Sequence, residues 1–380
     1  MKNIEIAEEY RRQRVEAESR KQGFDTVGRD GYLAWAKKNR PKLLEIARNN
    51  GFEVDRLDSA VDDYMQLLAE APARSEFDDI GSYIILKSII DRIENICGEV
   101  TAPTHDGVVF GAFPCYGVNA FQAQVMTTEA SIIAVSNQFI PFCNQVSKAM
   151  AKTLRHIPRG NFTQVVNDPK EVDVRLKEEP YLAACWALLF SHYAVDGWTP
   201  RNLGWGAFSI IETSTRVRIL EAIETFAIAH EYGHHVAKHG QINSSAATSD
   251  LFEIEYEADL FARGITMRFG TEATPPNPYA SSGACAVMLF GFIELIDRTK
   301  AILSKGGADL IQKPCSHPLM DARIQNIEKL DANIPPQVQA QFSVMRSCFR
   351  EIIEIVWRHI EPAIIEVAGK VDLSQYAEVE

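Results

Sequence analysis

The chain has 380 residues, of which 46% are hydrophobic and 24% are charged, and its formal net charge at pH 7 is −12. A chain of this length and composition can bury a large core in one or two domains. The acidic balance, with no run of basic residues to offset it, excludes nucleic acid or an anionic membrane surface as the main expected partner.

The N-terminal part of the chain is expected to be helical. Four segments have helical patterns, at residues 6–21, 33–49, 54–71 and 80–97. We assign residues 1–120 to an N-terminal helical region and expect it to act as a lid, a docking surface or a partner-binding layer.

Short strands are expected after these helices. Glycines punctuate the region 100–120 around Val108-Val109-Phe110, and Ser131 to Ser136 is the clearest strand. The strand at 131–136 is either an ordinary core strand or an edge strand that pairs with an extended peptide. The predicted fold class is therefore mainly α with a small β-sheet (α+β).

A candidate metal site lies in the helical segment that follows. Hydrophobic residues recur every three or four positions from Ile219 onward, and His230 and His234 continue the same stripe. Two histidines four residues apart lie on one face of a helix, so both imidazoles can bind one ion. Glu231 lies about 100° around the helix from His230, where it can hold a metal-bound water without being a ligand. The stretch 230–234 therefore matches the H-E-x-x-H signature of zinc proteases, and the alternative is a core helix whose histidines are satisfied without a metal.

A second helix offers the third ligand that a zinc site needs. Asp250 and Glu253 form a capping-box pattern that predicts its start. Glu255 can bind the metal, and Asp259 on the same face can accept a hydrogen bond from a ligand histidine and orient it. Glu253 and Glu257 compete for the ligand role and are interpreted as solvated surface residues.

Small residues predict close packing of these two helices. Gly233 costs about 1 kcal/mol of helix stability relative to Ala, which indicates that another element packs against the backbone there, and Ala258 is small enough to allow it. Gly240 is expected to end the first helix as its C-cap. His235 and His239 are also four apart, but they lack a glutamate at the matching offset and are expected at the surface.

A third element is the tripeptide Ser316-His317-Pro318, in which Pro318 is expected to open a helix. A histidine fixed at that helix start beside a zinc site can donate a hydrogen bond to a tetrahedral oxyanion. Further on, residues 341–380 are assigned to a C-terminal helix and tail, with the helix expected to break at Pro362.

In this order, H-E-x-x-H at 230–234, E-x-x-A-D at 255–259 followed by Phe261-Ala262, and S-H-P at 316–318 with Arg323 five residues beyond the proline resemble the M48 family of zinc metallopeptidases. The likeness covers roughly residues 210–330. It differs from the family in a short gap between the first two motifs and in lacking the transmembrane helices of many members. The short gap, and the E-x-E-A run at 255–258, also resemble the ImmA/IrrE metallopeptidases, which rank second because they lack the S-H-P element.

The M48 resemblance implies a zincin-like core of the gluzincin type over residues 121–340, beside the N-terminal helical layer. It implies one Zn²⁺ per chain and a protein or peptide substrate. The residue roles it implies are zinc ligation by His230, His234 and Glu255, general base catalysis by Glu231, orientation of a ligand by Asp259, and contact with the substrate carbonyl by His317.

The expected function is thus that of a soluble zinc-dependent metalloendopeptidase. The alternatives are a regulatory protease of the ImmA type with a single target, in a phage or stress response, and a non-catalytic zinc-binding interaction protein. No apolar run reaches the roughly 18 residues of a membrane span, and no signal peptide is visible. The seven cysteines are dispersed without a C-x-x-C pair, which fits a reducing cytoplasm. Cys315 beside His317 is set aside as a nucleophile because no base is assigned to it, and the oligomeric state is left open.

Overall fold

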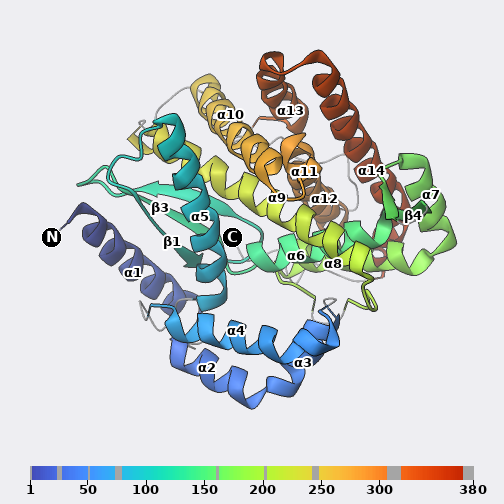
Figure 1. The fold of residues 1–380 in the computed structure, drawn as a ribbon, viewed down its shortest axis with the longest axis horizontal. Helices are drawn as coiled ribbons and strands as arrows, with labels where there is room; N and C mark the ends of the chain where they lie inside the picture. The colour runs from blue at the N-terminus through green and yellow to red at the C-terminus, as the bar shows by residue number, and fades with distance from the viewer. Residues whose placement is uncertain are drawn as a thin grey trace.

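The computed structural model describes residues 2–23, 28–49, 52–72, 79–159, 162–200, 203–241, 248–305 and 318–370. These residues are mostly helical, with one small three-stranded sheet and one two-stranded sheet, so the predicted mainly α fold class is confirmed (Figure 1). The helices are α1 (Asn3–Gln22), α2 (Gly28–Lys38), α3 (Arg40–Asn49), α4 (Leu57–Glu70), α5 (Ile80–Val100), α6 (Phe139–Thr153), α7 (Pro169–Glu178), α8 (Pro180–Val195), α9 (Ile210–Val236), α10 (Thr248–Glu272), α11 (Pro278–Ser281), α12 (Ala284–Lys305), α13 (Met320–Glu328) and α14 (Pro336–Ala368). The strands are β1 (Val108–Phe113), β2 (Ala120–Gln124), β3 (Ser131–Ser136), β4 (Arg155–Arg159) and β5 (Phe162–Val166), and the 3₁₀ helices are η1 (Val54–Arg56), η2 (His239–Gln241) and η4 (Lys329–Asn333).

The three-stranded sheet has the order β1-β3-β2, with β3 parallel to β1 and antiparallel to β2. Side chains alternate between its two faces. Ile132 and Ala134 pack with α1, whereas Ile133 and Val135 join the main core, where α5 and α9 lie against the sheet (Figure 1). β3 pairs on both sides and is buried along its whole length, so it is an ordinary core strand. The edge-strand alternative for 131–136 is wrong, and the edge beside α9 belongs to β2.

Helix α9 runs through the middle of the molecule and packs most extensively against α10 (Figure 1). α6 and α12 also pack against it, and the C-terminal half of α9 is buried on nearly all sides. The helix at 284–305 lies behind this pair, where Phe290 packs edge-to-face on Phe226 of α9. The motif-bearing residues therefore lie in the rigid interior rather than on a loop.

The close approach of α9 and α10 that Gly233 and Ala258 predict is confirmed. A β-carbon placed on Gly233 would lie 3.1 Å from the Cα atom of Ala258 and 3.2 Å from its carbonyl oxygen. Both atoms belong to the α10 backbone, so they can retreat only if the whole helix moves.

Gly233→Ala is therefore expected to lower the free energy of unfolding. Overpacking of this kind costs about 1–3 kcal/mol, which exceeds the roughly 1 kcal/mol that alanine gains over glycine in a helix. The matched control is Gly264→Ala in α10, where no atom lies within 4 Å of the added carbon, so the same substitution should stabilise the protein. Chemical unfolding of both variants measures the difference, and equal gains in stability would contradict the close packing.

The end of α9 differs from the sequence prediction. The helix ends at Val236, and Lys238 takes the left-handed conformation (φ 57°) in place of Gly240. Gly240 lies instead in η2, where a β-carbon would come 2.8 Å from Cβ of Gln124. Glycine is thus needed there because the turn packs against β2.

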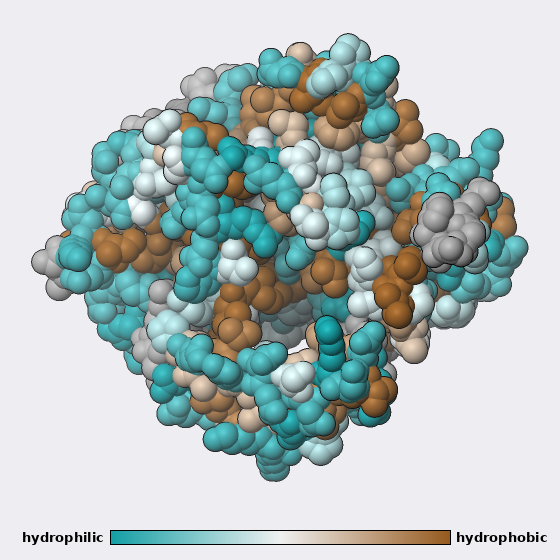
Figure 2. All heavy atoms as spheres, in the orientation of Figure 1, coloured by the Kyte–Doolittle hydropathy of each residue, from teal (hydrophilic) through white to brown (hydrophobic). Residues whose placement is uncertain are grey.

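The N-terminal layer is more divided than the sequence indicates. The helix predicted at 33–49 is split into α2 and α3 next to Asn39. Pro41 explains the split, because proline lacks an N–H and its ring clashes with the preceding turn, whereas it is accepted in the first turn of a new helix. α2, α3 and α4 pack on one another and reach α5. Figure 2 shows a mostly hydrophilic surface on this side, with hydrophobic residues around a hollow above α4.

The C-terminal helix was predicted to break at Pro362, and this is wrong. α14 continues through Pro362 to Ala368. Pro362 is exposed, while Ile360 and Ile364 on either side of it are fully buried and hold the helix against the core. Within the parts of the chain that the structure describes, no helix is long and apolar enough to cross a membrane.

Candidate metal centre

Three buried side chains from two helices converge at the α9–α10 contact. The Nε2 atoms of His230 and His234 lie 3.1 Å apart. Oε2 of Glu255 lies 3.4 Å from Nε2 of His230, and Oε1 of the same carboxylate lies 3.5 Å from Nε2 of His234. Among the described residues, no other group of three or more His, Cys, Asp or Glu side chains comes together in this way.

The spacing of these atoms suits a tetrahedral metal ion. Zinc binds nitrogen and oxygen at about 2.0–2.2 Å, so two ligand atoms of a tetrahedral site lie about 3.3–3.6 Å apart. The two Nε2 atoms are 3.1 Å apart, and each lies 3.4–3.5 Å from a different oxygen of Glu255, which is close to that value. His230, His234 and Glu255 can therefore hold one ion and leave its fourth position free.

Local sequence explains why the ligands face one another. α9 begins at a capping box, in which the side chain of Ser209 accepts from the N–H of Glu212 and the side chain of Glu212 accepts from the N–H of Ser209. From there the four-residue spacing places both histidines on one face. Because α10 crosses that face at Gly233, it brings Glu255 to the open side of the two imidazoles.

Asp259 orients the first histidine. Its Oδ1 atom lies 3.0 Å from Nδ1 of His230, and the side chain is fully buried. Arg323 from α13 donates two hydrogen bonds to this carboxylate, from Nε at 2.7 Å and from Nη2 at 2.6 Å. Burial alone would raise the pKa of Asp259, but the charge and hydrogen bonds of Arg323 outweigh it and lower the pKa. Asp259 is thus held as a carboxylate that accepts the Nδ1 proton of His230.

Arg323 is the arginine five residues beyond Pro318 in the third motif, for which the sequence alone indicated no role. Its guanidinium carbon lies 4.1 Å from the ring centroid of Phe290, and its Nη2 atom is 3.7 Å from Glu255. A bidentate arginine stacked on an aromatic ring is fixed in orientation. The signal that could have found it is its position five residues after Pro318, at the start of a helix.

The two ligand histidines differ in basicity. Burial lowers the pKa of His230, but hydrogen bonds to Asp259 and Glu255 outweigh it and raise the pKa to about 9. Burial and the nearby charge of His230 lower the pKa of His234 to about 3. At neutral pH without a metal, His230 is therefore protonated on both ring nitrogens, whereas His234 is neutral.

Metal uptake should depend on pH for this reason. A metal ion must displace the His230 proton, so its apparent affinity should rise at least about tenfold per pH unit from pH 6 toward pH 9. His234 adds nothing in this window, because it is already neutral. Competition with a coloured chelator at pH 6, 7 and 8, corrected for the chelator's own protonation, measures the slope. A flat profile would show that His230 is neutral before the metal binds.

Glu231 is buried beside the ligands, with 8% of its surface exposed. Burial and the charge of Glu255 raise the pKa of its carboxyl group, and the charge of His230, with a smaller effect of the backbone N–H of Gln122 in β2, partly opposes the rise. A carboxyl group whose pKa is raised is suited to take up a proton and release it near neutral pH.

The surface prediction for His235 and His239 is wrong. His235 is 2% exposed, with Nδ1 2.8 Å from Oγ of Ser131 and Nε2 3.0 Å from the carbonyl oxygen of Thr104. These bonds attach the end of α9 to the sheet. His239 is 8% exposed and its Nδ1 atom lies 2.9 Å from Nδ1 of His234.

The remaining predicted residues fall into two groups. Glu253 and Glu257 are exposed, as predicted, although Glu257 also contacts His239. His317 and Cys315 lie outside the described residues, and the helix expected to open at Pro318 begins at Met320.

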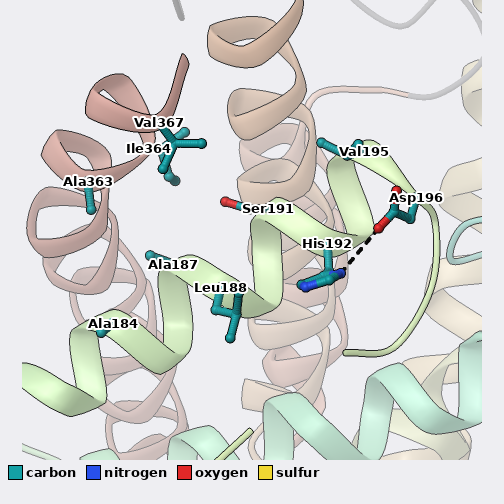
Figure 3. A pocket seen from close by; sticks show the side chains of 10 residues that line it. All are labelled: Ala184, Ala187, Leu188, Ser191, His192, Val195, Asp196, Ala363, Ile364 and Val367. Atoms are coloured by element: carbon teal, nitrogen blue, oxygen red, sulfur yellow. Dashed lines mark hydrogen bonds and ion pairs between the residues drawn. The ribbon is translucent and has the colours of Figure 1, made fainter. Parts of the chain in front are cut away.

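A groove of about 400 Å³ lies elsewhere, between α8 and the end of α14 (Figure 3). Its walls are apolar, with Leu188 and Ile364 on opposite sides and the hydrogen-bonded pair His192 and Asp196 at one end. It contains none of the metal-centre residues, and of its three polar side chains, Ser191, His192 and Asp196, only His192 and Asp196 are hydrogen-bonded to each other. The chemistry of this molecule is thus assigned to the α9–α10 contact.

Comparison of the chain with family models, with curated proteins and with solved structures gave no match.

Proposed function

We propose that this protein is a zinc-dependent metalloendopeptidase that hydrolyses peptide bonds in a protein or peptide substrate. The observation that carries the proposal is the buried group of His230, His234 and Glu255, whose possible ligand atoms lie within 4.8 Å of one another, with Glu231 in the next position of the same helix as His230. The resemblance to the M48 family supports the same conclusion.

The residues divide the reaction between them. His230, His234 and Glu255 would hold the zinc ion, which would supply a Lewis acid for the activation of water and of the substrate carbonyl. Glu231 takes the proton of the attacking water and returns it to the leaving amine. Asp259 and Arg323 keep His230 in the tautomer whose Nε2 lone pair faces the ion.

The substrate is proposed to lie along β2. This strand is at the edge of the sheet and packs against α9. The backbone N–H of Gln122 in this strand is one of the groups that lower the pKa of Glu231, so a peptide paired with β2 would pass beside the general base. An extended chain can add to such an edge as a further strand through main-chain hydrogen bonds.

A cytoplasmic location is proposed from the state of the cysteines. The six cysteines that lie in the described residues are all free, which supports a reducing compartment such as the cytoplasm.

The direct test is hydrolysis of an unfolded protein such as casein, followed by electrophoresis. Activity should disappear on treatment with a zinc chelator and return with added Zn²⁺, because the proposed reaction depends on zinc as its Lewis acid. Cleavage that survives complete removal of the metal would refute the proposal. A protein that binds zinc but leaves all unfolded substrates intact would favour the single-target or non-catalytic alternatives.

A further inference from the structure

A second histidine chain begins at the other metal ligand. The Nδ1 atom of His234 lies 2.9 Å from Nδ1 of His239, and Nε2 of His239 lies 3.0 Å from Oε2 of Glu257. His239 is 8% exposed, and its ring meets that of His234 at 70° with centroids 5.0 Å apart. The three side chains thus form one continuous row that leads away from the metal centre.

Hydrogen-bond chemistry gives this row one direction. A metal bound to Nε2 of His234 leaves the ring proton on Nδ1, which must be donated. Nδ1 of His239 can accept it only when His239 carries its own proton on Nε2. That proton then faces the carboxylate of Glu257, which can only accept. The donor and acceptor roles of His234, His239 and Glu257 are therefore each determined, and the row ends at the negative charge of Glu257.

The position of His239 is fixed by the packing of the turn that carries it. It lies in η2, directly before Gly240, which packs against Gln124 of β2. The preceding residue, Lys238, has a left-handed backbone and forms an ion pair with Glu129. The packing of this turn therefore holds the imidazole of His239 against that of His234.

We propose that His239 is a positioning residue of the metal centre, which fixes the tautomer and orientation of His234 and couples it to the charge of Glu257. This inference rests on the proposed function, in that it assumes a metal bound to Nε2 of His234. The two ligand histidines are then supported differently. His230 has a buried carboxylate paired with Arg323, whereas His234 has an imidazole backed by a carboxylate that is 67% exposed.

The test uses the full chain and two readouts other than activity: the zinc dissociation constant, and the visible spectrum of the Co²⁺-substituted protein. His239→Ala is expected to weaken zinc binding about 10–100-fold and to change the cobalt spectrum, because His234 loses its acceptor. His239→Gln should restore most of the affinity, since an amide can accept from Nδ1 of His234 and donate to Glu257. His192→Ala, on a half-buried residue of α8 in the groove that contains none of the metal-centre residues, is the matched control and should leave both readouts unchanged.

Wild-type affinity and spectrum in His239→Ala would overturn the inference, and so would equal losses in His239→Ala and His239→Gln. Should His239→Ala fail to fold, His239→Gln and Glu257→Gln decide. The inference requires near-normal zinc affinity in His239→Gln and a several-fold weaker zinc affinity in Glu257→Gln. Any other pair of results overturns it. A wild-type protein that binds zinc without hydrolysing peptides would sink the proposed function and leave this inference standing. Absence of zinc binding would overturn both.

Discussion

Replacing Glu231 by Gln should lower peptide hydrolysis by about 10²–10⁴-fold, the usual contribution of a general base, and should leave zinc bound. The amide has the shape of the carboxyl group, and its oxygen can still accept the hydrogen bond from the N–H of Gln122. It cannot take up the proton of the attacking water. Because Glu231 is not among the three ligand side chains, the metal content should be unaffected.

Turnover of a fluorogenic peptide and zinc content, measured on the same preparation, test this prediction together. Glu253→Gln is the matched control, since it makes the same change on an exposed side chain of α10. Substantial hydrolysis by the Glu231→Gln variant would remove Glu231 from the mechanism. Loss of zinc in that variant would show that the substitution had disturbed the ligands instead.

Replacing Glu255 by Ala should weaken zinc binding by more than about 100-fold, since ligand loss should exceed the 10–100-fold cost of removing an outer-shell partner. Glu255 supplies the carboxylate oxygens that lie next to the Nε2 atoms of His230 and His234. Without Glu255, the buried positive charge of Arg323, which lies 3.7 Å from the Glu255 carboxylate, is balanced by Asp259 but no longer by Glu255. Two histidines then remain, which is fewer than the three protein ligands of catalytic zinc sites.

Equilibrium dialysis against buffered zinc measures the effect, and Glu253→Ala on the same helix provides the control. Unchanged zinc affinity in the Glu255→Ala variant would assign the third ligand to another residue. Glu253 and Glu257 are the nearest alternatives in sequence, but Glu253 is exposed and the carboxylate of Glu257 is directed to His239.

The parts of the site that depend on helical periodicity could be predicted from the sequence. The four-residue spacing of His230 and His234, and of Glu255 and Asp259, fixes a shared face whatever the rest of the fold. The small residues Gly233 and Ala258 indicated where the two helices meet. These inferences are local, so one sequence was sufficient for them.

The parts that depend on distant contacts could not be predicted. Whether His239 is exposed is decided by the packing of η2 on β2, and whether a strand lies at an edge is decided by its pairing partners. Arg323 bonds to Asp259 across 64 positions of the chain, so its place after Pro318 could mark it as a candidate residue but could not identify Asp259 as its partner. Pro362 continues a helix because tertiary burial on either side outweighs its local preference.

The most direct test of the account is the amount of zinc per chain, determined by elemental analysis of the purified wild type and of His234→Ala. We expect about one zinc per wild-type chain and little in the variant, because a structural or catalytic site of this kind does not survive loss of a central ligand. No zinc in the wild type, even after incubation with Zn²⁺, would contradict the metal centre and with it the proposed function.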